Sequence, residues 1–169
     1  FNLNVPAFKV ASFELTDLPL INYIASKGKP ILLSTGMSNE SEIAEALDTC
    51  YQAGNKDVLL FHCISNYPTD LKDTNLGDIS YIAKYFNVEV GLSDHTTSNL
   101  ASILAIAQGA SAIEKHFKLD NTDCGPDSSF SLVPEELKRL CVDCNLAFEA
   151  LKSSKLQRGS SELKNKQFR

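Results

Sequence analysis

The sequence lacks the positive charge and the long apolar runs that would indicate nucleic-acid binding or a membrane span. Its formal net charge is −5 over 169 residues, so affinity for an anion must come from a local site. No apolar run approaches the roughly 18 to 20 residues of a membrane-spanning helix. The chain opens at Phe1 without a basic and apolar leader pattern. We therefore expect neither a nucleic-acid nor a membrane partner.

The sequence also lacks a disulfide framework. Its five cysteines are an odd number without regular spacing, which is typical of a reducing compartment, and we expect a cytoplasmic protein. Cys141 and Cys144 have C-x-x-C spacing, but they fall within a helical pattern without a second pair, so a zinc ribbon is not expected. We expect Cys50 and Cys63 to pack in the core.

What the sequence does contain is an alternation of short apolar segments and helical patterns. Segments rich in β-formers predict strands at 7–11, 30–33, 57–62, 88–92 and 110–114. Apolar residues at helical spacing predict helices at 18–26, 41–51, 75–86, 98–108 and 134–151. Asn39 and Glu42 are placed as a capping pair for the second helix. Five βα units therefore follow one another along the chain.

Near-continuous apolar strands separated by helices predict a parallel sheet, either doubly wound or part of a (β/α)8 barrel. Neither a G-x-G-x-x-G pattern nor a P-loop follows the first strand, which disfavours a nucleotide-binding sheet. The strands instead end in polar residues, where barrels build active sites. We expect an α/β fold, a (β/α)8 TIM barrel of which residues 1–151 form about the last five βα units. The other strands would lie upstream of Phe1 or come from a pairing partner.

Two histidines end successive predicted strands, His95 the fourth and His116 the fifth. Because these strands are neighbours in a barrel, the two imidazoles are placed to share a divalent ion. The alternative is a pair of ordinary histidines bonded to the backbone. Asp94 and Glu114 favour the metal, since carboxylates beside imidazoles orient the rings or supply an oxygen ligand. His62 also ends a strand, but its apolar neighbours favour a place in the core or wall.

A second group of side chains at the same strand ends suits an anion. It consists of one lysine and four hydroxyl residues: Lys9, Ser12, Ser34, Thr35 and Ser93. With the N-terminus of the helix after Gly36, such donors bind phosphate or carboxylate. Singly, each hydroxyl is better explained as a helix cap, and it is the group together with the lysine that favours an anion pocket. Asp127 either adds an acidic residue after the fifth strand or belongs to a turn.

Several segments together resemble the sialic acid synthase family, in family order along nearly the whole chain. They are Lys9-Val-Ala-Ser12-Phe13-Glu14, Gly28-Lys-Pro-Ile-Leu-Leu-Ser34-Thr35-Gly36-Met37, His62-Cys-Ile-Ser-Asn-Tyr67-Pro68, Gly91-Leu-Ser93-Asp94-His95-Thr96, Glu114-Lys-His116-Phe117 and Gly125-Pro126-Asp127. The resemblance implies a carbon-carbon bond-forming transferase that condenses phosphoenolpyruvate with an N-acetylated amino-sugar aldehyde, releasing phosphate and forming a nonulosonic acid. It also implies a (β/α)8 barrel and a divalent metal, Mn²⁺ or Mg²⁺.

The resemblance also assigns roles to individual residues. The metal ligands would be His95 and His116. Phosphoenolpyruvate would be held by Lys9, Ser12, Ser34 and Ser93, and by Ser65 at a position where some members of the family have asparagine. The sugar would face Glu14, Tyr67, Glu114 and Asp127. The three carboxylates, Glu14, Glu114 and Asp127, would be the catalytic groups, and one of them, such as Glu114, would move protons.

Two segments bear on which sugar is used. Ala11-Ser12-Phe13-Glu14 and Ser128 after Asp127 look more like pseudaminic acid synthases, because sialic acid synthases usually have Gly-Ser-Gly-Glu/Asp and a basic residue there. A less polar pocket suits a dideoxy, bis-acetamido sugar, since an unpaired buried polar group would penalise a missing hydroxyl. We favour pseudaminic acid, with N-acetylneuraminate and legionaminate as the alternatives.

Members of the family also have earlier strands with an acidic residue and a lysine, and an antifreeze-like domain that reaches into the partner's site of a homodimer. Residues 152–169 would be the exposed linker towards that domain. We therefore expect the isolated chain to be inactive or very weak. Two other classes stay open: a different metal-dependent barrel enzyme, such as an aldolase or hydrolase, and a non-catalytic fragment or binding module.

Overall fold

The sheet has five parallel strands in a computed structural model that describes residues 4–122, 124–152 and 158–168. The strands are β1 (Phe8–Val10), β2 (Ile31–Ser34), β3 (Val58–Cys63), β4 (Glu89–Asp94) and β5 (Ile113–Lys115). The helices that follow them are α1 (Leu18–Ala25), α2 (Glu40–Gln52), α3 (Gly77–Phe86), α4 (Leu100–Ala107) and α5 (Pro134–Leu151). The five predicted βα units are confirmed.

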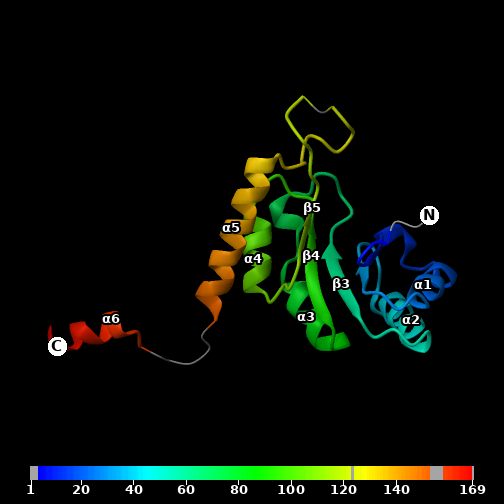
Figure 1. The fold of residues 1–169 in the computed structure, drawn as a ribbon, viewed down its shortest axis with the longest axis horizontal. Coiled ribbons are helices and arrows are strands. Elements are labelled where there is room, and N and C mark those ends of the chain that lie inside the picture. The colour runs from blue at the N-terminus through cyan, green and yellow to red at the C-terminus, as the bar shows by residue number, and fades with distance from the viewer. Residues whose placement is uncertain (1–3, 123, 153–157, 169) are drawn as a thin grey trace.

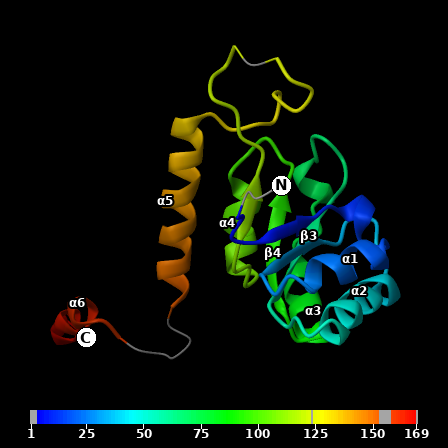
Figure 2. The same ribbon diagram turned by 45° about the vertical axis from the view of Figure 1, so that its right-hand side comes forward.

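The strand order identifies the architecture. Each strand pairs with the one before it in the chain, in the order β1-β2-β3-β4-β5. Figure 1 labels β3, β4 and β5 of this sheet, and Figure 2 shows β3 and β4 from a second direction. A doubly wound sheet reverses its order at a switch point, whereas a barrel adds strands in sequence order. The chain therefore forms a curled part of a (β/α)8 barrel, and the predicted fold class is confirmed.

Two strand boundaries differ from the prediction by more than one residue. The strand predicted to end at Leu92 continues to Asp94, and the strand predicted from Ala110 begins only at Ile113. The amide of Ala110 donates to the carbonyl of Ala105 at 2.9 Å. Ala110 therefore completes the end of α4 and does not take part in the sheet.

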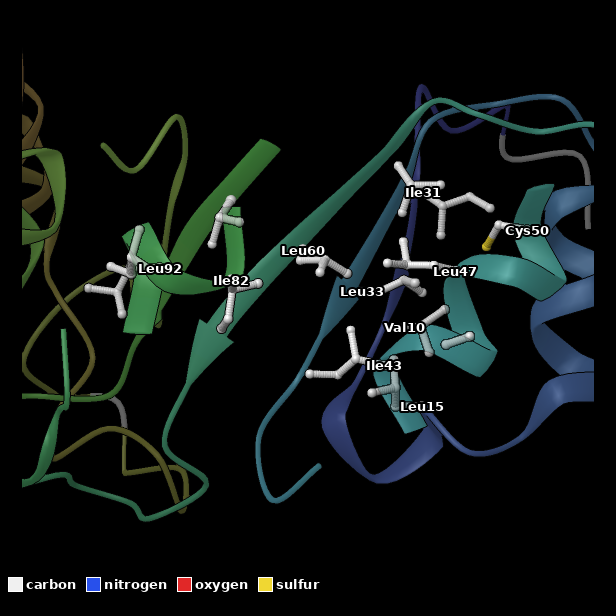
Figure 3. Close-up of a cluster of buried hydrophobic side chains, with 14 of the residues drawn as sticks. Val10, Leu15, Ile31, Leu33, Ile43, Leu47, Cys50, Leu60, Ile82 and Leu92 are labelled. Atoms are coloured by element: carbon white, nitrogen blue, oxygen red, sulfur yellow. The ribbon is translucent and has the colours of Figure 1, made fainter. Parts of the chain in front are cut away.

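One face of the sheet carries the hydrophobic core. Its buried residues include Val10, Leu33, Leu60, Val90 and Leu92, which cluster with buried residues of α1 to α4 (Figure 3). Cys50, on α2, belongs to the same cluster, and burial raises the pKa of its thiol to about 11. The predicted packing of Cys50 is thus confirmed.

The opposite face carries polar side chains, because successive residues of a strand alternate between faces. Ser34 pairs in register with Phe61, and Ser93 with Glu114. Lys9 lies on the same face, since Val10 next to it is in the core. In a closed barrel this is the interior face, and it leads up to the strand ends where the candidate site lies.

Local signals in the sequence place α2. The side chain of Asn39 accepts a hydrogen bond from the amide of Glu42 at 3.0 Å, and the carboxylate of Glu42 accepts one from the amide of Asn39 at 2.9 Å. This is the predicted capping pair. It fixes the start of the helix just beyond the end of β2.

The segment from 152 onwards was predicted to be an exposed linker. Within it, Ser160–Leu163 forms a short helix, α6, and Lys164–Phe168 a 3₁₀ turn, and these residues are exposed. Residues 153–157 and 169 lie outside the described part of the chain. The linker role stays a prediction. None of the described helices is long and apolar enough to cross a membrane.

Gly91 in β4 is expected to tolerate no larger side chain. A Cβ atom there would lie 2.6 Å from the carbonyl oxygen of Ala112 and 2.6 Å from the ring of Phe61. Because a backbone oxygen cannot move aside easily, Gly91→Ala should lower the free energy of unfolding by about 1 to 3 kcal/mol in urea titrations. Gly77→Ala is the matched control, since a Cβ at Gly77 meets nothing within 4 Å. Equal stability of the two variants would contradict this packing.

Candidate active site

The two predicted metal ligands lie together at the carboxyl ends of β4 and β5. The ring centroids of His95 and His116 are 5.5 Å apart, at an interplanar angle of 63°. The strands are paired in register immediately before them, Asp94 with Lys115. The structure therefore brings together two histidines that are 21 positions apart in the sequence.

The hydrogen bond of His95 determines which ring nitrogen is available. Its Nδ1 is 2.8 Å from the carbonyl oxygen of Ile64. Because a carbonyl only accepts, Nδ1 carries the proton and Nε2 keeps its lone pair. Burial lowers the pKa of His95, an effect that the bond to Ile64 partly offsets. The ring is therefore neutral near pH 7, the form that binds metals.

His116 is contacted by the segment between β5 and α5, which projects beyond the sheet as the yellow loop of Figure 1. The Nδ1 of His116 is 3.6 Å from a carboxylate oxygen of Asp127. The ring of Phe130, from the same segment, packs edge-on against His116 at 4.9 Å. Asp127, predicted to face the sugar, thus lies beside a candidate metal ligand.

The residues fit part of a divalent-metal site. The Nδ1 of His95 donates to a carbonyl and the Nδ1 of His116 lies near a carboxylate, and carbonyls and carboxylates are the usual outer partners of metal-binding histidines. Across the described residues, no three His, Cys, Asp or Glu side chains gather into a complete set of ligands. His95 and His116 would therefore supply two positions, and further ligands would have to be oxygen atoms from substrate, water or other parts of a closed barrel.

Glu114 joins two of the predicted phosphoenolpyruvate residues. Its Oε1 accepts a hydrogen bond from the hydroxyl of Ser93 at 2.7 Å and lies 3.3 Å from the ammonium of Lys9. The hydroxyl of Ser93 is also 3.4 Å from the Nε2 of His95. A cation, a carboxylate and a hydroxyl thus reach from β1, β4 and β5 to the edge of the histidine pair.

Two of the serines predicted to hold phosphoenolpyruvate, Ser12 and Ser65, pack closely against Gly36. We call the surroundings of Ser12, Ser34, Ser65 and Gly36 the anion space. The hydroxyl of Ser12 accepts from the Gly36 amide at 3.1 Å. A Cβ on Gly36 would lie 2.4 Å from the hydroxyl oxygen of Ser65 and 2.8 Å from that of Ser12. In the described part of the chain, Ser34 and Ser65 carry the buried hydroxyls without a hydrogen-bond partner. Since buried hydroxyls are normally bonded, these two are available to a ligand.

Tyr67 covers the histidine pair. Its ring centroid is 4.2 Å from that of His95 and 6.1 Å from that of His116. Burial raises the pKa of its phenol, an effect that the nearby hydroxyl of Ser65 partly offsets. The phenol therefore stays protonated near neutral pH and can donate a hydrogen bond.

Several predictions for this region are wrong. Asp94 does not orient the imidazoles, because its carboxylate is on the core side, bonded to Lys115 and Ser102. The hydroxyl of Thr35 donates to the carbonyl of Phe61 at 3.1 Å and so is not free for an anion. The start of α2 is not an open anion site either, because Asn39 caps the Glu42 amide.

Glu14, predicted to face the sugar, is held in the turn that follows β1. Its carboxylate accepts from the amide of Ala11 at 3.0 Å in a local turn, and the residue is exposed. His62 faces away from the site, with its Nε2 2.8 Å from the carbonyl of Thr74. The lower ranking of His62 is thus confirmed.

Sequence reasoning missed two residues. Cys63 is buried as expected, but its sulfur is 3.0 Å from the hydroxyl of Ser12 and so belongs to the anion space. Lys115 forms a buried ion pair next to His116. For Cys63 the signal was the alternation of side chains along β3. It places Cys63 on the same face as Phe61, which is the face opposite the core. For Lys115 the signal was a lysine in a buried strand, which requires a partner.

Comparison with known proteins agrees with this geometry. The sequence profile of the NeuB family matches residues 1–156. The chain is 41% identical to the pseudaminic acid synthase of Helicobacter pylori and 41% identical to the N,N'-diacetyllegionaminic acid synthase of Campylobacter jejuni. The alignments cover 95% and 96% of the chain but 45% and 49% of those proteins. The chain thus spans about half the length of these relatives.

A solved structure is also similar. The N-acetylneuraminic acid synthetase of Leptospira borgpetersenii, crystallised with citrate, matches with a TM-score of 0.89 and 31% identity, over 98% of this chain and 58% of that one. The similarity covers the whole curled sheet and its helices. On the match of the family profile to nearly all of the sequence, the chain belongs to the NeuB family.

Proposed function

We propose that this chain is part of an enzyme that condenses phosphoenolpyruvate with an N-acetylated amino-sugar aldehyde to give a nonulosonic acid and phosphate. The observation that carries the proposal is the meeting of two groups at the strand ends. A pair of imidazoles lies beside a cation and two unpartnered buried hydroxyls. Aldolases and hydrolases with a metal would need the histidines but not the anion space.

The anion space is where phosphoenolpyruvate would bind. The hydroxyls of Ser12, Ser34 and Ser65 would donate to phosphate oxygens, and the ammonium of Lys9 would neutralise negative charge on the same ligand. Lys9 is at present paired with Glu114 at 3.3 Å. An anionic ligand would therefore compete with Glu114 for Lys9 and free the carboxylate for proton transfer.

A divalent ion, Mn²⁺ or Mg²⁺, would be held by His95 and His116 and would polarise the aldehyde oxygen of the sugar. The enolpyruvate methylene then attacks the aldehyde carbon, water adds at C2, and phosphate leaves. Glu114, next to both Lys9 and Ser93, would move protons in these steps. Tyr67 and Asp127 would line the sugar side of the imidazoles.

The sugar we favour is the pseudaminic precursor, a deoxy bis-acetamido sugar. The support is that Phe13 is apolar and that Ser128 stands where sialic acid synthases usually have a basic residue. Phe13 is exposed, and the hydroxyl of Ser128 is turned back onto the carbonyl of Gly125 at 2.7 Å. Neither residue offers a charge to a sugar hydroxyl. Equal identity to pseudaminic and legionaminic relatives keeps legionaminate and N-acetylneuraminate as the alternatives.

We place the protein in the cytoplasm, as a homodimer in its full-length form. The support for the compartment is that the cysteines at 50, 63, 124, 141 and 144 are all free thiols, which suits a reducing environment. The dimer follows from the family resemblance of the sequence.

The test uses a chimera, because residues 1–169 cover about half of the relatives and we expect little or no turnover from them alone. Residues 1–151 replace the matching segment of the H. pylori synthase. With Mn²⁺, phosphoenolpyruvate and the pseudaminic precursor, the chimera should release phosphate in proportion to sugar consumed. Glu114→Gln should lower the rate about 10²- to 10⁴-fold without loss of phosphoenolpyruvate binding.

Three outcomes separate the alternatives. Faster release with the N-acetylneuraminate or legionaminate precursor would change the sugar but keep the reaction. Turnover of an aldehyde without phosphoenolpyruvate would indicate a different barrel aldolase. Failure of the isolated chain to bind phosphoenolpyruvate by calorimetry, together with an inactive chimera that is folded, would leave a non-catalytic fragment.

A further inference from the structure

Below the histidine pair lies a buried ion pair that the proposed reaction does not use. The ammonium of Lys115 is 2.9 Å from a carboxylate oxygen of Asp94, and their side chains are 2% and 0% exposed. A buried ion pair is often replaceable by apolar residues without loss of stability. Stability alone therefore does not explain why two charges are placed here.

The pair holds the backbone on both sides of His95. The second carboxylate oxygen of Asp94 accepts from the amide of Thr96 at 2.8 Å, and the ammonium of Lys115 donates to the carbonyl of Thr96 at 2.6 Å. On α4, the hydroxyl of Ser102 donates to Asp94 at 2.6 Å. The residues before and after His95 are thus fixed to β5 and to a helix.

The same pair fixes His116 relative to His95. Asp94 and Lys115 are partners in the register of β4 and β5, and each immediately precedes one of the histidines. One position earlier, on the opposite face, the hydroxyl of Ser93 bonds to Glu114 at 2.7 Å. Two cross-strand contacts on opposite faces prevent the strand ends from sliding or rotating past each other.

We propose that Asp94 and Lys115 are positioning residues, which hold His95 and His116 at the separation needed to share one divalent ion. The inference rests on the metal site of the proposed function. The pair touches neither imidazole and acts through the backbone, whereas Ile64 and Asp127 act on the rings directly. Both kinds of support are needed to place two ligands from different strands.

The first test needs no metal. The chain has three histidines, so ¹⁵N-histidine labelling gives three resolvable ring environments by NMR. In Lys115→Met, the ring signals of His95 and His116 should shift or broaden. The signals of His62, which is bonded to Thr74 on the core side, should stay in place and serve as the internal reference.

The second test measures Mn²⁺ affinity by the EPR signal of the free ion. Lys115→Met and Asp94→Asn should each raise the Kd roughly tenfold or more, the range found when outer supports of metal ligands are removed. The double variant Asp94→Leu with Lys115→Met removes both charges together. It should recover thermal stability while its Kd for Mn²⁺ stays raised.

Leu47→Ala is the matched control, since Leu47 is buried on α2 in the core and its loss lowers stability without touching β4 or β5. It should leave both the Kd and the histidine signals unchanged. If Lys115→Met does not fold, the double variant and Ser102→Ala take its place, with a smaller shift expected for Ser102→Ala.

The proposal is overturned if the signals of His95 and His116 are unchanged in folded variants, or if Leu47→Ala raises the Kd as much as Lys115→Met does. Absence of Mn²⁺ binding by the wild-type chain would instead contradict the metal site of the proposed function. The NMR comparison would then decide the positioning role by itself.

Discussion

Replacing His95 or His116 by glutamine is expected to raise the Kd for Mn²⁺ by more than 100-fold. These imidazoles are the two nitrogen ligands that we propose, and their ring centroids are 5.5 Å apart. Loss of a partner outside the metal shell already costs roughly 10- to 100-fold in affinity, and loss of a ligand costs more. Phosphate release by the chimera should fall in parallel with the loss of metal binding.

The measurement is a titration of Mn²⁺ against each variant, followed by the EPR signal of the free ion. His62→Gln is the matched control, because His62 is bonded to the carbonyl of Thr74 on the core side and glutamine keeps a donor there. Its Kd should be close to that of the wild-type chain. Equal weakening in all three variants would show that the histidines act through stability and not as ligands.

Gly36→Ala is expected to weaken the binding of phosphoenolpyruvate about 10- to 100-fold, the equivalent of the cost of overpacking a tight site. The added Cβ would overlap the hydroxyl oxygen of Ser65 at 2.4 Å and contact the sulfur of Cys63 at 2.9 Å. These atoms border the space assigned to the phosphate. Pushing them aside would fill that space or turn the hydroxyl of Ser65 away from the ligand.

Calorimetry with phosphoenolpyruvate measures this effect in the isolated chain, and Gly77→Ala is the control because a Cβ there has open space around it. The affinity of Gly36→Ala for Mn²⁺ should remain unchanged, since the histidines follow β4 and β5 and a Cβ on Gly36 meets neither of them. Normal phosphoenolpyruvate binding by Gly36→Ala would place the phosphate elsewhere. Loss of both ligands would indicate a folding defect.

The fold could be predicted from the sequence because its signals are local. Apolar strands recur at the spacing of βα units, and the Asn39 and Glu42 pair marks a helix start that the structure confirms. The same sequence regularity places polar residues at the ends of neighbouring strands. Parallel strands bring those ends to one edge of the sheet, so His95 and His116 could be paired correctly.

The parts that could not be predicted depend on which face a side chain occupies. Asp94 is next to His95 in the sequence, but alternation along β4 turns it towards Lys115 and Ser102 in the core. Its position next to His95 in the sequence therefore led to the wrong prediction that it orients the imidazole. Likewise, the start of α2 was expected to hold an anion, but the capping side chain that makes the helix predictable also occupies its amide.

Cys63 illustrates a different limit. Its burial was predicted from its hydrophobic character, and the structure confirms that burial. Its contact with Ser12, at 3.0 Å, joins the end of β3 to the turn after β1. A contact between residues 51 positions apart depends on the curl of the sheet, which no local pattern specifies.

The central claim is that one edge of this sheet holds both the metal and phosphoenolpyruvate. A crystal structure of the chain with Mn²⁺ and phosphoenolpyruvate tests it most directly, because anomalous scattering locates the manganese. We expect manganese bound to His95 and His116, with phosphate oxygens bonded to Ser12, Ser34 and Ser65. Manganese bound elsewhere, or phosphoenolpyruvate on another surface with these hydroxyls still unpartnered, would contradict it.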